Sequence, residues 1–98
     1  MLAGVDAESN QAETVVRIVN QAGLHARPVM AFVDLANTYQ ASLCVSKGEC
    51  RVDGKSPMEM MLLEAPQGTE LHLVATGADA QDLVADLAKL VAGGFGEP

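Results

Sequence analysis

Hydrophobic residues recur with different periods in the segment that begins at Thr14 and in the segment that begins at Ala26. The segment TVVRIV, which begins at Thr14, is rich in β-branched residues and has the length of a strand, and NQAG after it has the composition of a turn. From Ala26 to about Asn37, apolar residues recur at steps of three and four: Val29, Phe32, Val33 and Ala36. This pattern predicts a strand, a turn and then a helix with one apolar face.

The segment SLCVSKGECRV predicts a β-hairpin that turns at Lys47 and Gly48 and pairs Val45 with Cys50. Directly opposed residues point to the same side of a sheet. One face then carries Leu43, Val45, Cys50 and Val52, and the other carries Cys44, Ser46, Glu49 and Arg51. The two cysteines lie on opposite faces, so we expect free thiols rather than a disulfide.

The segment SPMEMMLLE carries a capping-box pattern. Ser56 occupies the cap position, Pro57 the first helical position, and Glu59 is placed to reach back to the cap. This pattern predicts a short helix that starts at Ser56 and ends before Pro66.

The last third of the chain predicts a strand and a final helix. PQGT reads as a turn and ELHLVA as a strand. In GADAQDLVADLAKLVAGG, Asp79 is placed to cap a helix and Gly93 to end it. The apolar stripe of this helix comprises Leu83, Val84, Leu87, Leu90 and Val91.

These elements follow the order β-α-β-β-α-β-α, which favours an α+β fold. We expect an open-faced β-sandwich, in which a four-stranded antiparallel sheet is covered on one face by three helices. The chain of 98 residues suffices for one modest core, and we assign residues 14–98 to a single domain. Residues 1–13 are acidic and lack a sustained period, which predicts a flexible tail.

The charge of the chain narrows the classes of partner. The net charge is −7, and the six Lys and Arg residues are scattered, which argues against binding to nucleic acid or to a membrane surface. Apolar runs such as PVMAFV are far shorter than the roughly 20 residues of a membrane span, and the N-terminal segment lacks the pattern of a signal peptide. We therefore expect a cytoplasmic protein.

Two histidines are the candidates for chemistry, since the chain shows no Ser/His/Asp set, metal-ligand cluster or phosphate loop. His72 alternates with leucines inside a predicted strand and should be an exposed sheet residue. His25 lies in GLHARP, at the start of the first helix. The N–H groups and dipole of a helix start favour an anion and disfavour an imidazolium, which would leave a neutral, nucleophilic ring.

Arg27 would add a guanidinium that attracts the oxygens of a phosphoryl group, and Gly23 would allow a tight turn before His25. No acidic residue is close to His25 in the sequence. The alternative is that His25 merely caps the helix and that Arg27 is a solvated side chain. The residues alone leave both interpretations open.

Three segments, GLHARP, GKSPMEMMLL and QGTELHLVATGADAQDLVADL, resemble the HPr family of histidine-containing phosphocarriers of the bacterial sugar phosphotransferase system. The resemblance runs from about Thr14 to Val91. It implies that phospho-enzyme I phosphorylates His25 on Nδ1 and that the group passes to IIA components of sugar permeases. Arg27 matches the family's arginine that contacts the phosphoryl group. The protein would then be a carrier rather than an enzyme, without cofactor or metal.

The resemblance also implies a regulatory site at Ser56, which matches a serine that a dedicated kinase modifies in many Gram-positive members. Pro57 and Glu59 depart from the family pattern there and change what a kinase would read. Ser56 alternatively acts only as the helix cap, and the two roles can coexist.

Docking to protein partners needs an adaptable apolar patch, which Met30, Met58 and Met61 could supply unless they belong to the core. For Met60 a core position is equally plausible on the sequence alone. Two other functions stay open: a regulatory HPr-like module in a nitrogen branch or in catabolite control, and an interaction domain without phosphate chemistry.

Overall fold

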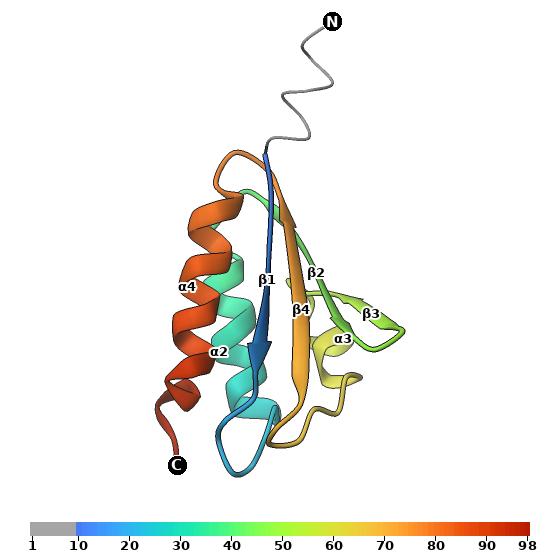
Figure 1. The fold of residues 1–98 in the computed structure, drawn as a ribbon, viewed down its shortest axis with the longest axis vertical. Coiled ribbons are helices and arrows are strands. Elements are labelled where there is room, and N and C mark those ends of the chain that lie inside the picture. Colours follow the sequence, from blue (N-terminus) through green and yellow to red (C-terminus); the bar gives the residue numbers. More distant parts are fainter. Residues whose placement is uncertain (1–9) are drawn as a thin grey trace, which may run out of the picture.

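The computed structural model describes residues 10–98 and shows a sheet backed by helices (Figure 1). The strands are β1 (Gln11–Arg17), β2 (Ser42–Lys47), β3 (Cys50–Asp53) and β4 (Glu70–Thr76). The helices are α2 (Ala26–Ala36), α3 (Pro57–Met61) and α4 (Ala80–Ala92), and a 3-10 turn, η1 (Gly94–Gly96), follows α4. This order confirms the expected α+β arrangement.

The four strands form one antiparallel sheet in the order β1-β4-β2-β3. The first strand begins at Gln11 rather than Thr14, because Gln11 pairs with Thr76 at the end of β4. Residues 11–13 therefore belong to the sheet and not to a tail. The strand was predicted too short because its first residues are mostly polar and exposed and so carry no strong apolar pattern. The rest of the expected tail, residues 1–9, lies outside the described residues.

The β2–β3 hairpin turns at Gly48 and Glu49, one residue later than expected, so that Lys47 pairs with Cys50 and Val45 with Val52. Gly48 takes a positive φ of 59° at the first central position, which suits glycine. The expected partner of each residue was wrong by two positions. Because side chains alternate with a period of two, this shift leaves the predicted faces unchanged. Both thiols are free, as expected.

Only one of the two hydrogen bonds predicted for the capping box of α3 is present. The Ser56 hydroxyl accepts a hydrogen bond from the Glu59 N–H at 3.2 Å, which confirms Ser56 as the cap. The Glu59 carboxylate does not return to the cap and instead accepts from the N–H of Asp53 at 2.9 Å. Glu59 thereby ties α3 to the end of β3.

Asp79 precedes α4, but its side chain does not cap the helix. Its two carboxylate oxygens accept from the backbone N–H groups of Gln40 and Ala41, each at 2.8 Å. The hydrogen bond from Gln40, followed by that from Ala41, lowers the pKa of Asp79. The prediction of a cap was wrong because these donors lie in the α2–β2 connection, which is remote in sequence.

The core lies between the sheet and the helices and contains the apolar face expected for α2. Its largest fully buried apolar side chains are Ile18, Val29, Phe32, Val45, Met60, Leu63, Leu71, Leu73, Leu83, Leu87 and Val91. Met60 is thus a core residue. Leu90, expected in the stripe of α4, is only half-buried.

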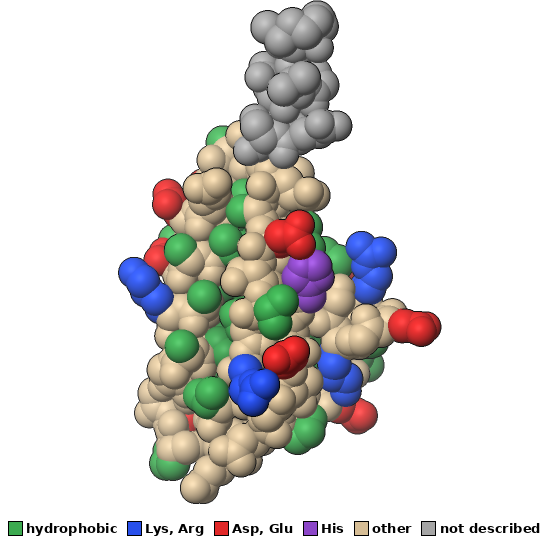
Figure 2. All heavy atoms as spheres, in the orientation of Figure 1, with side chains coloured by type: hydrophobic (Ala, Val, Ile, Leu, Met, Phe, Trp, Pro, Cys, Tyr) green, Lys and Arg blue, Asp and Glu red, His purple; other side chains and the backbone are tan. Residues whose placement is uncertain are grey.

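The sequence predicted that the protein binds neither nucleic acid nor a membrane. On the face drawn in Figure 2, basic side chains lie apart from one another rather than gathering in a patch. Among the described residues, no helix has the length and apolar character needed to cross a membrane. His72 is exposed on β4, as expected, and its Nε2 lies 2.7 Å from a carboxylate oxygen of Glu13 on β1.

Candidate functional site

His25 lies at the N-cap position of α2, and its backbone is extended with φ −93° and ψ −168°. Its side chain makes no capping hydrogen bond. The His25 side chain therefore does not cap the helix. The ring is 45% exposed and turns away from the helix toward the C-terminal segment of the chain.

The loop before His25 is held by a network of backbone contacts. Gly23 has a positive φ of 74°, and an added Cβ would meet the carbonyl oxygen of Ala65 at 2.7 Å. This close approach lets the N–H of Leu24 donate to the same carbonyl at 2.8 Å. The Asn20 side-chain amide donates to the Gly23 carbonyl at 2.8 Å. Gly23 thus serves the tight turn expected from its type, and the loop fixes where α2 begins.

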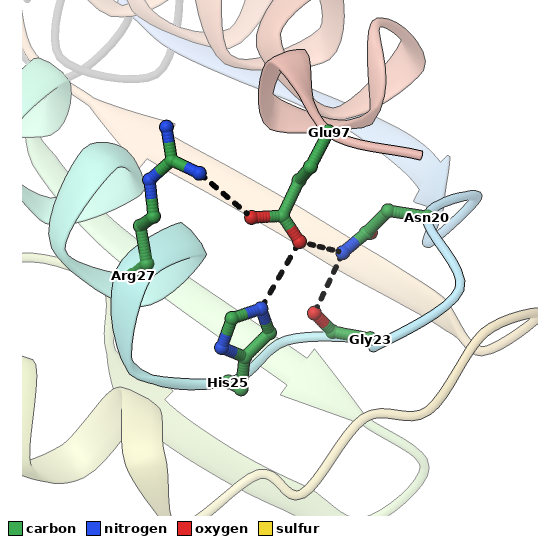
Figure 3. A network of polar contacts seen from close by, with 5 residues as sticks. All are labelled: Asn20, Gly23, His25, Arg27 and Glu97. Carbon is green, nitrogen blue, oxygen red and sulfur yellow. Dashed lines mark hydrogen bonds and ion pairs between the residues drawn. The ribbon is translucent and has the colours of Figure 1, made fainter.

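A carboxylate completes the site, although no acidic residue is close to His25 in the sequence. Glu97 Oε1 lies 3.0 Å from His25 Nε2, and Oε2 lies 3.5 Å from Arg27 Nη1 (Figure 3). Asn20 Nδ2 donates to Oε1 at 3.0 Å. The Glu97 side chain is only 11% exposed. Sequence reasoning missed Glu97 because 72 positions separate it from His25 and no local pattern links the two.

Glu97 reaches the site because the segment after α4 turns toward the loop that carries His25. Gly93 ends the helix, as predicted, and the next two residues have positive φ, 66° at Gly94 and 58° at Phe95. Phe95 is buried against the core. The Pro98 carbonyl then accepts from the N–H of Gln21 at 2.8 Å. The C-terminal segment is thus bound to the loop that carries His25.

The contacts of Glu97 stabilise its charged form. The hydrogen bond with His25 is the main cause that lowers the pKa of Glu97, and the Asn20 amide and the charge of Arg27 act in the same direction against the effect of burial. A carboxyl group with a lowered pKa stabilises the docked state above its ordinary pKa, and the effect is lost as the pH falls through the lowered value.

We therefore expect the C-terminal segment to leave the His25 loop only in acid, with a midpoint below the ordinary Glu value of 4.5. An NMR pH titration follows the chemical shifts of the Gln21 amide and the Glu97 side-chain carboxyl. The two shifts should change with the same midpoint. A Glu97 midpoint at or above 4.5 would contradict this assignment.

The other predicted site residues lie on α2 and α3, which pack against each other. The side chains of Met30, Met58 and Met61 are all exposed, at 45%, 82% and 46%. Leu62 is also exposed, at 69%, and was not predicted. These four residues are called the apolar patch below. Ser56 is half-buried at the start of α3.

Loss of the Ser56 hydroxyl should destabilise the protein modestly. Ser56→Ala removes the acceptor for the Glu59 N–H, and the loss of an N-cap costs about 1 kcal/mol. Urea denaturation of both proteins measures this difference, with Ser46→Ala as a control that removes an equally half-buried serine from β2. A difference of zero between Ser56→Ala and the wild type would contradict a capping role.

The chain is similar to known proteins. The family model "PTS HPr component phosphorylation site" matches residues 12–93. The phosphocarrier protein HPr of Neisseria meningitidis serogroup A is 39% identical over 82 residues, which cover 84% of this chain and 92% of that protein.

Solved structures are similar as well. HPr from Thermoanaerobacter tengcongensis is 36% identical with a TM-score of 0.85, and the match covers 89% of this chain and 98% of that one. Crh, described as the Bacillus subtilis catabolite repression containing protein, is 35% identical with a TM-score of 0.69 and covers 81% and 91% of the two chains. The chain therefore belongs to the HPr family of phosphocarrier proteins of the phosphotransferase system, which carry phosphoryl groups and are not catalysts.

Proposed function

We propose that His25 accepts a phosphoryl group on Nδ1 from phospho-enzyme I and passes it to IIA components of sugar permeases, in the cytoplasm. One observation carries this proposal. His25 is an exposed imidazole at the N-terminus of an 11-residue helix, and its ring makes no hydrogen bond to that helix. The helix start supplies N–H groups and a positive field for the oxygens of an incoming phosphoryl group.

The chemistry asks little more of the carrier than position and charge. A phosphoryl group passes between in-line donor and acceptor atoms, and catalysis of this step rests on positioning and electrostatic stabilisation. Arg27 lies two residues beyond His25, and its side chain is 77% exposed. Its guanidinium is held by the 3.5 Å contact with Glu97 and can exchange this contact for phosphoryl oxygens.

The proposal is tested by incubating the protein with enzyme I and phosphoenolpyruvate. The expected result is one phosphate per chain that is stable in base and labile in acid, as a nitrogen-linked phosphate is. A second reaction with a known HPr shows that enzyme I is competent. No label on this chain beside a labelled control contradicts the proposal.

Arg27→Ala should slow phosphorylation without affecting the fold. A hydrogen bond to a charged group contributes about 1.5 kcal/mol, which corresponds to about a tenfold loss in rate. Rapid-quench kinetics measure the rate, with Arg51→Ala, an exposed arginine on β3, as the matched control. An Arg27→Ala rate equal to that of Arg51→Ala would exclude the proposed role.

The apolar patch is the proposed docking surface for enzyme I and IIA. Met58 and Met61 lie on α3, which packs beside α2, so a partner that reaches His25 can also cover them. Methionine side chains adapt to partners of different shape. The same surface includes the cap of α3, where a phosphate on Ser56 would add negative charge beside the docking residues.

A second candidate function is regulation through protein complexes, with an HPr kinase acting on Ser56. The similarity to Crh favours it. Two features oppose it: Pro57 and Glu59 follow the serine and depart from the family pattern, and the Ser56 hydroxyl is engaged as a helix cap. Incubation with an HPr kinase and ATP distinguishes the two functions, since regulation requires an acid-stable phosphate that Ser56→Ala abolishes.

A further inference from the structure

We infer that Glu97 is a positioning residue that holds the His25 ring with its proton on Nε2, and so presents Nδ1 as the atom that accepts the phosphoryl group. This inference deepens the proposed function and rests on His25 being the acceptor. It assigns a role in transfer to the C-terminal segment, which does not belong to the motif around His25.

The hydrogen-bonding groups around the Glu97 carboxylate determine which ring nitrogen carries the proton. An ionised carboxylate only accepts hydrogen bonds, so His25 Nε2, at 3.0 Å from Oε1, must be the donor. In a neutral imidazole only one nitrogen carries a proton, and the other keeps its lone pair. Nδ1 is then the nucleophilic atom.

The carboxylate itself is held in place. Asn20, which is 1% exposed, donates from Nδ2 both to Glu97 Oε1 and to the carbonyl of Gly23. One amide therefore ties the carboxylate to the loop that positions the imidazole. The Pro98 carbonyl adds a second attachment through the N–H of Gln21. A residue that orients a histidine needs this kind of support.

Glu97 also acts on the charge that develops during transfer. The Nδ1 lone pair forms the new bond to phosphorus, while the bond from phosphorus to the donor's leaving group breaks and its electron pair departs with that group. The proton on Nε2 stays on the ring, which becomes positively charged. The carboxylate beside Nε2 stabilises this charge, as the acid of a catalytic triad does for its histidine.

The contact of Glu97 with Arg27 differs from its contact with His25. The contact with Arg27 is longer, at 3.5 Å, and the Arg27 side chain is far more exposed than the carboxylate it meets. Arg27 can therefore leave for the phosphoryl oxygens while Glu97 remains on His25. The carboxylate keeps its ring contact throughout the step.

The test compares three variants with the wild type, using 15N-labelled histidine. Glu97→Ala removes both the acceptor and the charge, Glu97→Gln keeps a carbonyl oxygen as acceptor, and Glu49→Gln removes an exposed carboxylate at the hairpin turn as a control. Long-range 1H–15N NMR reports which ring nitrogen carries the proton. Rapid-quench kinetics with enzyme I report the rate of phosphorylation.

In Glu97→Ala we expect the proportion of the Nδ1–H form to rise and phosphorylation to slow by about tenfold. Glu97→Gln should keep the Nε2–H form, since it retains an acceptor oxygen. Its rate of phosphorylation should lie between those of Glu97→Ala and the wild type, since only the charge is lost. Glu49→Gln should match the wild type in both measurements. Gln21 amide shifts report separately whether the C-terminal segment still docks.

An unchanged tautomer ratio in Glu97→Ala would overturn the inference, as would phosphorylation at or above the wild-type rate. A faster rate would mean that the carboxylate blocks the site instead. Failure of the proposed function looks different: wild-type His25 would take no phosphate, while the tautomer measurements, made without phosphate, would still distinguish the variants.

Discussion

His25→Ala is expected to abolish phosphorylation by enzyme I while the protein stays folded. The side chain carries the proposed acceptor atom and makes no capping hydrogen bond, and it is nearly half exposed. Exposed substitutions away from special features change stability by no more than about 0.5 kcal/mol, and here the contact with Glu97 is lost in addition. Phosphate label measures the first effect and thermal unfolding the second.

His72→Ala is the matched control for this variant. His72 has the same side-chain exposure of 45% and also contacts a carboxylate, that of Glu13. It lies in the middle of β4, however, and not at a helix start. We expect it to be labelled like the wild type. Phosphate label that survives in His25→Ala and disappears in His72→Ala would show that His72, and not His25, is the acceptor.

Gly23→Ala is expected to weaken both the fold and the site. Alanine at a φ of 74° costs about 1–2 kcal/mol, and its Cβ would lie 2.7 Å from the carbonyl oxygen of Ala65 and 2.9 Å from Cα of Pro66. Both are backbone atoms, so the loop must shift and loses the hydrogen bond from Leu24 to Ala65. The free energy of unfolding should fall by about 3 kcal/mol in total.

The shift also moves His25, which follows Gly23 by two residues. A misplacement of about 1 Å can cost on the order of a hundredfold in rate, and we expect phosphorylation of folded Gly23→Ala to slow by that order. Gly68→Ala is the control, since Gly68 has a φ of 92° but open space where its Cβ would lie. Gly68→Ala should lose only the stability that alanine costs at a positive φ, about 1–2 kcal/mol, and should be phosphorylated at the wild-type rate. Equal losses in the two variants would contradict the role of the close approach.

Local patterns in the sequence were sufficient to predict most of the fold. The apolar stripe of α2 and the start of α3 at Ser56 follow from spacing and cap chemistry within a few residues. The hairpin shows the limit of such patterns, because turn position depends on which residue takes the positive φ, and Lys47-Gly48 and Gly48-Glu49 both contain Gly48. The faces were still predicted correctly, since the error in pairing was an even number of residues.

Two further errors share one cause, which is contact between residues far apart in sequence. Asp79 was expected to cap α4, whereas its donors lie 38 and 39 residues away. Glu97 was not expected at the site at all, because a loop after α4 returns it to His25. The motif GLHARP therefore predicted the imidazole and the arginine of the site, but not the carboxylate between them.

The proposed transfer step is tested by identifying the nitrogen atom that carries the phosphate. Protein with 15N-labelled histidine is phosphorylated with enzyme I and phosphoenolpyruvate, and the nitrogen bonded to phosphorus is identified from its 15N–31P coupling. We expect coupling to Nδ1 of His25, with Nε2 still protonated beside Glu97. Phosphate on Nε2 of His25, or on His72, would contradict it.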